Sequence, residues 1–121
     1  MSLRIYAYEK CDTCRKALKF LRERGVPYEV VAIREQPPTV EELRRMLGHV
    51  GGDIRRLFNT SGQDYRAMNL KERLPAMSPD ETFALLSSNG NLVKRPFALG
   101  TEQGVVGFKE EEWEGFVRGE R

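Results

Sequence analysis

Residues 3–33 read LRIYAYEKCDTCRKALKFLRERGVPYEVVAI, and they contain three segments with different spacings of apolar residues. In residues 3–8 the side chains alternate between two faces, which is typical of a strand. From Cys14 onward, apolar residues recur at positions 14, 17, 18 and 21, which predicts an amphipathic helix over about residues 12–24. Residues 28–33 are rich in β-branched side chains and predict a second strand. Because the connection is short, we expect a parallel βαβ unit with a right-handed crossover.

The middle of the chain predicts a helical block over about residues 39–88. Its helices have clear start signals, because Thr39 with Glu42 and Ser78 with Glu81 each match a capping box. Glycine and asparagine residues between the apolar stripes indicate that the block is broken into short helices rather than formed by one long helix. We therefore expect several short helices to follow the βαβ unit.

The last third of the chain predicts a hairpin and a final helix. Two short strands are expected over about residues 92–99 and 105–108, joined by a glycine-rich turn. Glutamates 110–112 place negative charge in the first turn of the last helix, where the helix dipole favours it. The resulting order, βαβ then helices then ββα, predicts an α/β fold with a sheet of about four strands.

Length and charge exclude several classes of protein. The chain has 121 residues, so one domain over residues 1–121 is expected. Lys and Arg number 20 against 18 acidic residues, and a net charge of +2 gives no indication of direct nucleic-acid binding. The longest apolar run has four residues, as in Val30 to Ile33, far fewer than the roughly 20 of a membrane span. No secretory signal precedes the first strand, so we expect a cytoplasmic protein.

Cys11 and Cys14 are the strongest chemical signal in the sequence. They form a Cys-x-x-Cys motif where the first strand leads into the first helix. Unpaired backbone N–H groups and the helix dipole favour a thiolate at Cys11, whereas Cys14 lies on the apolar stripe and is expected to be buried and less acidic. We predict that Cys11 is the nucleophile and Cys14 the resolving thiol. The nearby Lys10, Arg15 and Lys16 either add positive potential or are simply solvated.

Three other interpretations of the cysteine pair are a zinc half-site, a structural disulfide and two unrelated buried cysteines. Zinc needs about four ligands, and beyond the two cysteines the chain offers one histidine, His49, at a predicted helix end. A disulfide across two residues closes too small a loop to constrain the unfolded chain much. We therefore expect no metal and a redox-active pair.

Arg95-Pro96 is a second, weaker signal, at the start of a predicted strand. A proline there removes a ladder hydrogen bond, and about one X-Pro bond in twenty is cis in folded proteins. Lys94 and Arg95 fit equally well as exposed charges that protect an edge strand from aggregation. The residues alone leave both interpretations open.

Four motifs together resemble the arsenate-reductase-like ArsC/Spx family over essentially the whole chain. They are Cys11-Asp12-Thr13-Cys14-Arg15-Lys16-Ala17, Asn59-Thr60-Ser61-Gly62, Lys94-Arg95-Pro96 and Val106-Gly107-Phe108. The resemblance implies a thioredoxin-like (glutaredoxin-like) fold with a helical insertion, here about residues 39–88. It also implies a nucleophilic cysteine at Cys11, an anion-contacting arginine at Arg95 and a cis proline at Pro96 that faces the cysteine. Lys10 and Thr13, beside Cys11, complete the predicted substrate-binding residues.

The resemblance implies a thiol–disulfide oxidoreductase that acts on a disulfide or an oxyanion. No bound cofactor is expected, and the reductant would be an external thiol donor such as glutathione with glutaredoxin, or thioredoxin. Two alternatives stay open, a redox-sensing Spx-like regulator that binds RNA polymerase and a glutaredoxin-coupled arsenate reductase. Such arsenate reductases usually carry one active-site cysteine and further arginines, whereas this chain has Cys14, Asn59 and Phe108 at or near those places.

Overall fold

A computed structural model describes residues 3–119 and contains one mixed sheet of four strands in the order β2-β1-β3-β4. β1 pairs in parallel with β2 and antiparallel with β3, and β3 pairs antiparallel with β4. The strands are β1 (Arg4–Ala7), β2 (Glu29–Ala32), β3 (Phe97–Leu99) and β4 (Gly104–Val106). The predicted βαβ and ββα units are therefore both present, and the predicted α/β, thioredoxin-like fold class is confirmed.

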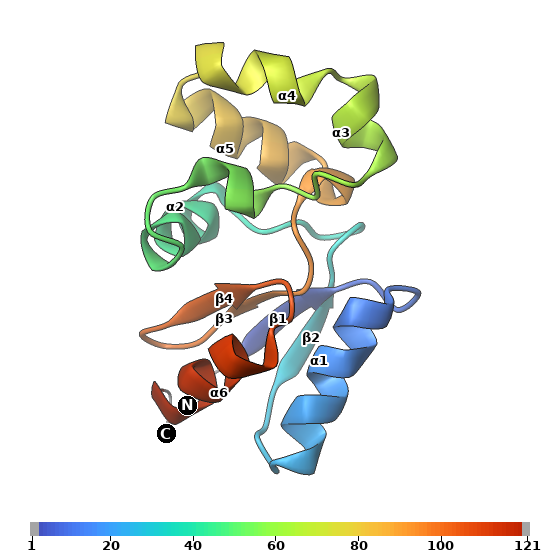
Figure 1. Cartoon of the computed structure of the whole chain (residues 1–121), viewed down its shortest axis with the longest axis vertical. Coiled ribbons are helices and arrows are strands. Elements are labelled where there is room, and N and C mark those ends of the chain that lie inside the picture. The colour runs from blue at the N-terminus through green and yellow to red at the C-terminus, as the bar shows by residue number, and fades with distance from the viewer. Residues whose placement is uncertain (1–2, 120–121) are drawn as a thin grey trace.

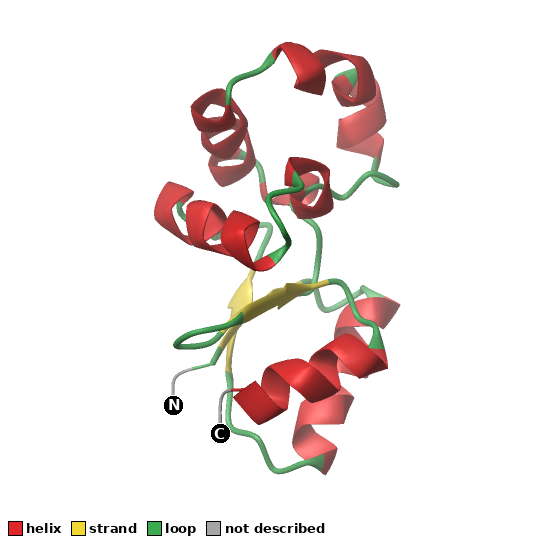
Figure 2. Cartoon of the chain, turned by 60° about the vertical axis from the view of Figure 1, so that its left-hand side comes forward, coloured by secondary structure: helices red, strands yellow, loops and turns green. Residues whose placement is uncertain are grey.

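Helices cover both faces of the sheet (Figures 1 and 2). α1 (Asp12–Glu23) and α6 (Glu110–Gly119) lie on one face, which we call the α1–α6 side. The other face is covered by the helical segment, which we define as residues 40–92 between β2 and β3. The segment contains α2 (Val40–His49), η1 (Ile54–Leu57), α3 (Gln63–Ala67), α4 (Leu70–Arg73), η2 (Leu74–Ala76), α5 (Pro79–Ser88) and η3 (Gly90–Leu92).

Alternation along the strands divides the buried side chains into two core clusters. Ile5 and Ala98 face the α1–α6 side, where they pack with the apolar stripe of α1 and with Trp113. Tyr6 and Phe97, their neighbours in sequence, face the helical segment, and their rings meet edge to face at 5.7 Å. Each face of the sheet is thus buried by a different set of helices, as expected for strands with a period of two.

Helix starts in the structure follow local sequence signals. Both predicted capping boxes are present, because the hydroxyls of Thr39 and Ser78 accept hydrogen bonds from the backbone N–H groups of Glu42 and Glu81, and the two glutamates accept in return. α1 ends at Glu23 with Arg24 as its C-cap, and Gly25 follows with a φ of +66°, a left-handed conformation that glycine adopts without strain. The predicted limits of these helices are confirmed to within a residue or two.

The strand predicted over residues 92–99 is wrong in its first half. Residues 90–92 form a 3-10 turn, and the Asn89 side chain caps it by accepting from the Asn91 N–H. Val93 makes one isolated bridge with Phe58, and the Lys94 N–H donates to the Leu57 carbonyl at 2.8 Å. This stretch thus hydrogen-bonds to the helical segment, and β3 begins only after the proline at position 96. The second predicted strand, 105–108, is observed as β4 and is shifted by one to two residues.

Gly90 marks the point where the helical segment returns to the sheet. A Cβ atom at this position would lie 1.9 Å from the backbone oxygen of Ile33, the residue after β2. Only glycine allows this close approach of two backbones. The end of the helical segment therefore lies against the point where the chain leaves β2.

None of the helices within residues 3–119 is both long and apolar enough to span a bilayer.

Candidate active site

Cys11 and Cys14 lie at the N-terminus of α1, in contact with each other. Cys11 is the N-cap residue, and its sulfur accepts a hydrogen bond from the Cys14 backbone N–H at 3.4 Å. Cys11 is partly exposed, whereas Cys14 is 1% exposed and packs in the core on the α1–α6 side. Both are free thiols. The predicted difference in burial between the two cysteines is present.

The surroundings of the two sulfurs shift their acidity in opposite directions. Burial raises the pKa of Cys11, but the hydrogen bonds from the thiol and backbone N–H of Cys14 and the charge of Arg95 outweigh it, so the pKa is lowered. Burial raises the pKa of Cys14 to about 12; the backbone of Tyr8 opposes this shift, and the neighbouring Cys11 sulfur adds to it. The pair therefore loses its first proton from Cys11 and keeps the second on Cys14, which can donate it to the Cys11 sulfur.

Arg95 is the cation that supports the Cys11 thiolate, through its charge and a side-chain hydrogen bond. Arg95 also contacts Tyr8, because the Arg95 Cζ lies 5.1 Å from the centre of the Tyr8 ring. The Arg95-Pro96 peptide bond is cis, as the family resemblance implied. The structure therefore brings the cysteines and the Arg95-Pro96 pair together at one site.

Tyr8 and Arg34 belong to this site, although the sequence did not single them out. The Arg34 Cζ lies 4.8 Å from the centre of the same Tyr8 ring that Arg95 contacts. The position of Tyr8, at the carboxyl end of β1 just before the cysteine motif, was the available signal. Arg34 carried no signal, because it reaches the site only through the pairing of β2 with β1.

The other basic residues near the cysteines have different surroundings. Arg15 forms an ion pair with Asp12 at 2.9 Å and donates to the Glu9 carbonyl at 3.0 Å. Lys10 and Lys16 are exposed. None of these three cations is among the causes of the lowered Cys11 pKa; Lys10 and Lys16 fit the solvated interpretation, whereas Arg15 is held by its ion pair with Asp12. Lys10 also lies outside the lining of the two hollows that border Cys14 and Thr13.

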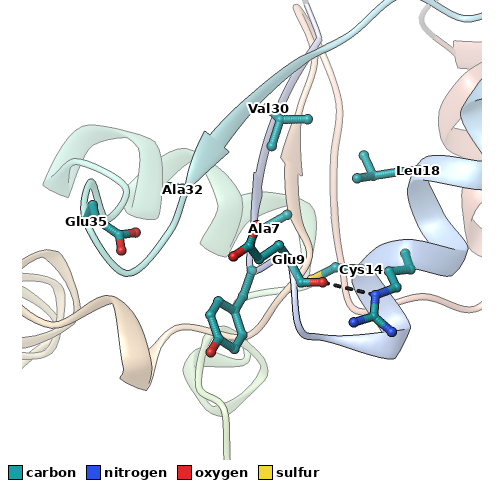
Figure 3. Close-up of a pocket in the computed structure, with 9 residues that line it drawn as sticks. Ala7, Glu9, Cys14, Leu18, Val30, Ala32 and Glu35 are labelled. Atoms are coloured by element: carbon teal, nitrogen blue, oxygen red, sulfur yellow. Dashed lines mark hydrogen bonds between the residues drawn. The ribbon is translucent and has the colours of Figure 1, made fainter.

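An apolar hollow of about 570 Å³ borders Cys14 (Figure 3). Leu18 of α1 faces Val30 and Ala32 of the edge strand β2 across it, and Glu9 and Glu35 lie at its rim. Val30 is 49% exposed, and it is the one large apolar side chain within residues 3–119 that is exposed to this degree. The buried sulfur thus has an apolar recess next to it.

A second hollow of about 420 Å³ borders Thr13, which lies within the cysteine motif. In contrast to the apolar hollow, its lining is rich in cations. It is lined by Thr13, Arg55, Arg56, Phe58, Thr60, Lys94, Val106, Gly107, Phe108, Lys109 and Glu112. Thr13 and Lys94 are therefore on the wall of this cationic hollow, as side chains that contact a substrate would be.

The described residues give no indication of a metal centre. Within residues 3–119 there is no group of three or more His, Cys, Asp or Glu side chains that could hold a metal ion. His49 is the last residue of α2, as predicted for a helix-end residue.

Comparisons with known proteins agree with this architecture. The chain is 50% identical to the uncharacterized protein YusI of Bacillus subtilis over 94% of this chain and 97% of YusI. It is 25% identical to the global transcriptional regulator Spx of Listeria innocua, over 93% and 85% of the two chains. A solved structure of a possible arsenate reductase from Streptococcus mutans superposes with a TM-score of 0.84 at 37% identity, covering 93% and 97%. The ArsC family model matches residues 6–116, and the chain belongs to the ArsC family.

Proposed function

We propose that this protein is a thiol–disulfide oxidoreductase in which Cys11 attacks a substrate disulfide and Cys14 resolves the mixed disulfide. The observation that carries the proposal is the placement of the two sulfurs: the partly exposed Cys11 caps α1 and accepts a hydrogen bond from the Cys14 N–H, and Cys14 is buried in the first turn. The pKa of Cys11 is lowered and that of Cys14 is raised, which favours Cys11 as the attacking thiolate and keeps the second sulfur from competing for the substrate.

In the first step the Cys11 thiolate attacks one sulfur of the substrate. The substrate S–S bond breaks, a Cys11–substrate disulfide forms, and the other substrate sulfur leaves as a thiolate that takes up a proton. Arg95 lies beside Cys11 and can hold an anionic group of the substrate near the reacting sulfur.

In the second step Cys14 releases the product. Burial is the main cause of the high Cys14 pKa and the Cys11 sulfur adds to it, and this added contribution ends once Cys11 is in the mixed disulfide. The Cys14 thiol then gives up its proton to solvent and attacks the Cys11 sulfur, so that the second substrate thiolate leaves. The substrate has gained two electrons and the cysteine pair has lost them, and an external thiol donor must return them.

Variants of the two cysteines test the proposal. Cys14→Ser, incubated with a glutathionylated peptide, is expected to accumulate a mixed disulfide on Cys11 that mass spectrometry detects, because the resolving thiol is missing. Cys11→Ser is expected to form no adduct, because the buried Cys14 is not ionised near neutral pH. An adduct on Cys11→Ser, or multiple turnover by Cys14→Ser without added thiol, contradicts the dithiol mechanism.

The electron donor can be identified in the same assay. Wild-type protein is supplied with glutathione and glutaredoxin in one arm and with thioredoxin in the other, and steady-state turnover is compared. Recovery of turnover in Cys14→Ser by glutathione alone would instead favour a monothiol mechanism.

Arsenate reduction is a second candidate, because a possible arsenate reductase from Streptococcus mutans is 37% identical to this chain. However, the two positions that depart from arginine have structural partners here. The Asn59 side chain donates to the Asn91 carbonyl at 3.4 Å, and the Phe108 ring packs against Phe20 and Trp113 at 5.7 and 5.6 Å. Neither can supply the cationic clamp of an oxyanion, so we expect little arsenate turnover in a parallel assay.

An Spx-like regulatory role is the third candidate, on the basis of the 25% identity to a global transcriptional regulator. A regulator of this kind would use the same cysteine pair as an oxidation sensor and would bind RNA polymerase. Retention of RNA polymerase on the immobilised protein, dependent on oxidation of Cys11 and Cys14, would favour regulation over enzymatic turnover.

A further inference from the structure

We infer that the cationic hollow beside Cys11 binds a carboxylate of the substrate, so that the preferred substrates are disulfides flanked by an acidic group. This inference rests on the proposed function and adds a substrate class to it. The hollow is separate from the Arg95 contact at the sulfur, because Arg95 is not part of its lining.

The position of the hollow places it within reach of a substrate attached to Cys11. Thr13, on its wall, is two residues after Cys11 in the first turn of α1. Phe108, also in the lining, packs like Cys11 against the core of the α1–α6 side. A residue next to the substrate cysteine spans about 3.3–3.6 Å of extended chain, so a neighbouring side chain can enter the hollow.

The charges that line the hollow leave three of its four cations open for a ligand. The fourth, Arg56, is paired with Glu112 at 3.6 Å. Among the residues that the structure describes, no carboxylate lies within 4.0 Å of the charged groups of Arg55, Lys94 or Lys109. A carboxylate in the hollow would therefore complete ion pairs that the folded chain leaves open.

The Lys94 side chain passes close to the backbone of Gly107, which also lines the hollow. Gly107 has a φ of +69°, and a Cβ atom there would lie 3.2 Å from the Lys94 Cε. The Lys94 stem thus passes close over a residue that has no side chain. The Gly107 N–H donates to the Pro96 carbonyl at 2.8 Å, which fixes the turn next to the proline that follows Arg95.

Hydroxyl groups add uncharged donors to the same hollow. Thr13 lines it from α1, and Thr60 lines it from the helical segment. A carboxylate accepts several hydrogen bonds at once, and bonds to charged donors are the stronger ones. Because the substrate must also contain a disulfide, the carboxylate belongs either to a small peptide thiol or to an acidic residue beside a protein cysteine.

The test compares two matched peptides in single-turnover reactions with reduced protein. Each peptide carries one cysteine in a mixed disulfide with 2-mercaptoethanol, and the neighbouring residue is Glu in one peptide and Gln in the other. Wild-type protein is expected to react up to about fivefold faster with the Glu peptide, the range of an exposed ion pair. Lys94→Gln and Arg55→Gln are expected to lose this preference, so that their rates with the two peptides become equal.

Lys71→Gln is the matched control, because Lys71 is an exposed lysine of α4 that lies outside the lining of the hollow. It is expected to keep the preference for Glu. Equal rates of wild type on both peptides, or an unchanged preference in Lys94→Gln, overturn the inference. Failure of wild type to react with either peptide overturns the proposed function instead.

Glutathione disulfide in a further arm distinguishes the two sources of the carboxylate. A loss of rate in Lys94→Gln with glutathione disulfide supports the inference and assigns the carboxylate to a small peptide thiol. A loss with the Glu peptide alone supports the inference and assigns it to an acidic residue of a protein substrate.

Discussion

The two sides of the sheet differ in how far their structure depends on residues that are close together in the sequence. On the α1–α6 side, one helix of 12 residues is capped by Cys11 and carries Cys14 and a continuous apolar stripe. The helical segment on the other side includes helices of five and four residues, α3 and α4, which are too short to be stable in isolation. The α1–α6 side thus follows from local pattern, whereas the helical segment depends on packing.

The two sides of the sheet also contribute differently to the site: one supplies the reacting sulfurs, and the other supplies several side chains that we propose bind the substrate. Both sulfurs lie on the α1–α6 side, in a position set by the start of a single helix. Arg55 and Thr60 come from the helical segment, and Lys94 and Arg95 from the connection that leaves it. We therefore expect changes in the helical segment to alter stability or substrate preference and to leave the acidity of Cys11 unchanged.

The largest expected effect is a loss of stability when a cavity is made in the core of the helical segment. Leu86 of α5 is fully buried, and Leu86→Ala is expected to lower the free energy of unfolding by about 2–5 kcal/mol. Urea unfolding measures this loss, and alkylation rates against pH measure the pKa of Cys11. A shift of the Cys11 profile in the folded variant would show that the two sides are coupled. Leu85→Ala, at a partly buried neighbour, is the control and should cost less.

The next largest effect is expected at Arg95, which lies in the connection between the helical segment and β3. Arg95 favours the thiolate, so Arg95→Gln should raise the pKa of Cys11 toward the usual value of about 8.5 and move its alkylation profile to higher pH. Reaction with anionic disulfides should fall about tenfold, with a smaller loss for neutral ones. Arg15→Gln is the control, because Arg15 is already paired with Asp12. An equal shift in both variants would contradict the role given to Arg95.

A smaller effect is expected from the caps of the helical segment. Ser78→Ala removes the acceptor for the Glu81 N–H at the start of α5, and should cost about 1 kcal/mol of stability. Urea unfolding measures the loss, with Ser61→Ala, an exposed serine between η1 and α3, as the control. If the rate of Cys11 alkylation changes as well, the site is more sensitive to this segment than we propose.

The smallest effect is expected at Tyr8, which acts as a positioning residue for Arg95. Tyr8→Leu removes the ring that Arg95 and Arg34 contact, an interaction that contributes about 0.5–1 kcal/mol at exposed sites. We expect a rise of a few tenths of a unit in the pKa of Cys11 and a higher KM for anionic disulfides, with kcat nearly unchanged. Tyr8→Phe keeps the ring and should restore both values. Equal behaviour of the two variants would assign Tyr8 a purely structural role.

Sequence patterns predicted those features that depend on neighbours along the chain. The helix that carries Cys14 and the capping boxes at Thr39 and Ser78 follow from spacings of three or four residues. The strand predicted from residue 92 was wrong because its hydrogen bonds go to residues 57–59, which no local pattern reveals. The contact of Arg34 with Tyr8 was missed for the same reason, since it depends on the pairing of two strands.

The close approach of Gly90 to Ile33 bears on how the chain could be shortened. Because Gly90 touches Ile33, a linker of a few residues could connect the end of β2 to the residues after Gly90, and the order of the strands in the sheet would be unchanged. Such a deletion would expose the side chains of Tyr6 and Phe97, which the segment now covers. A truncated protein would therefore keep its connectivity and lose solubility, unless these two positions were also made polar.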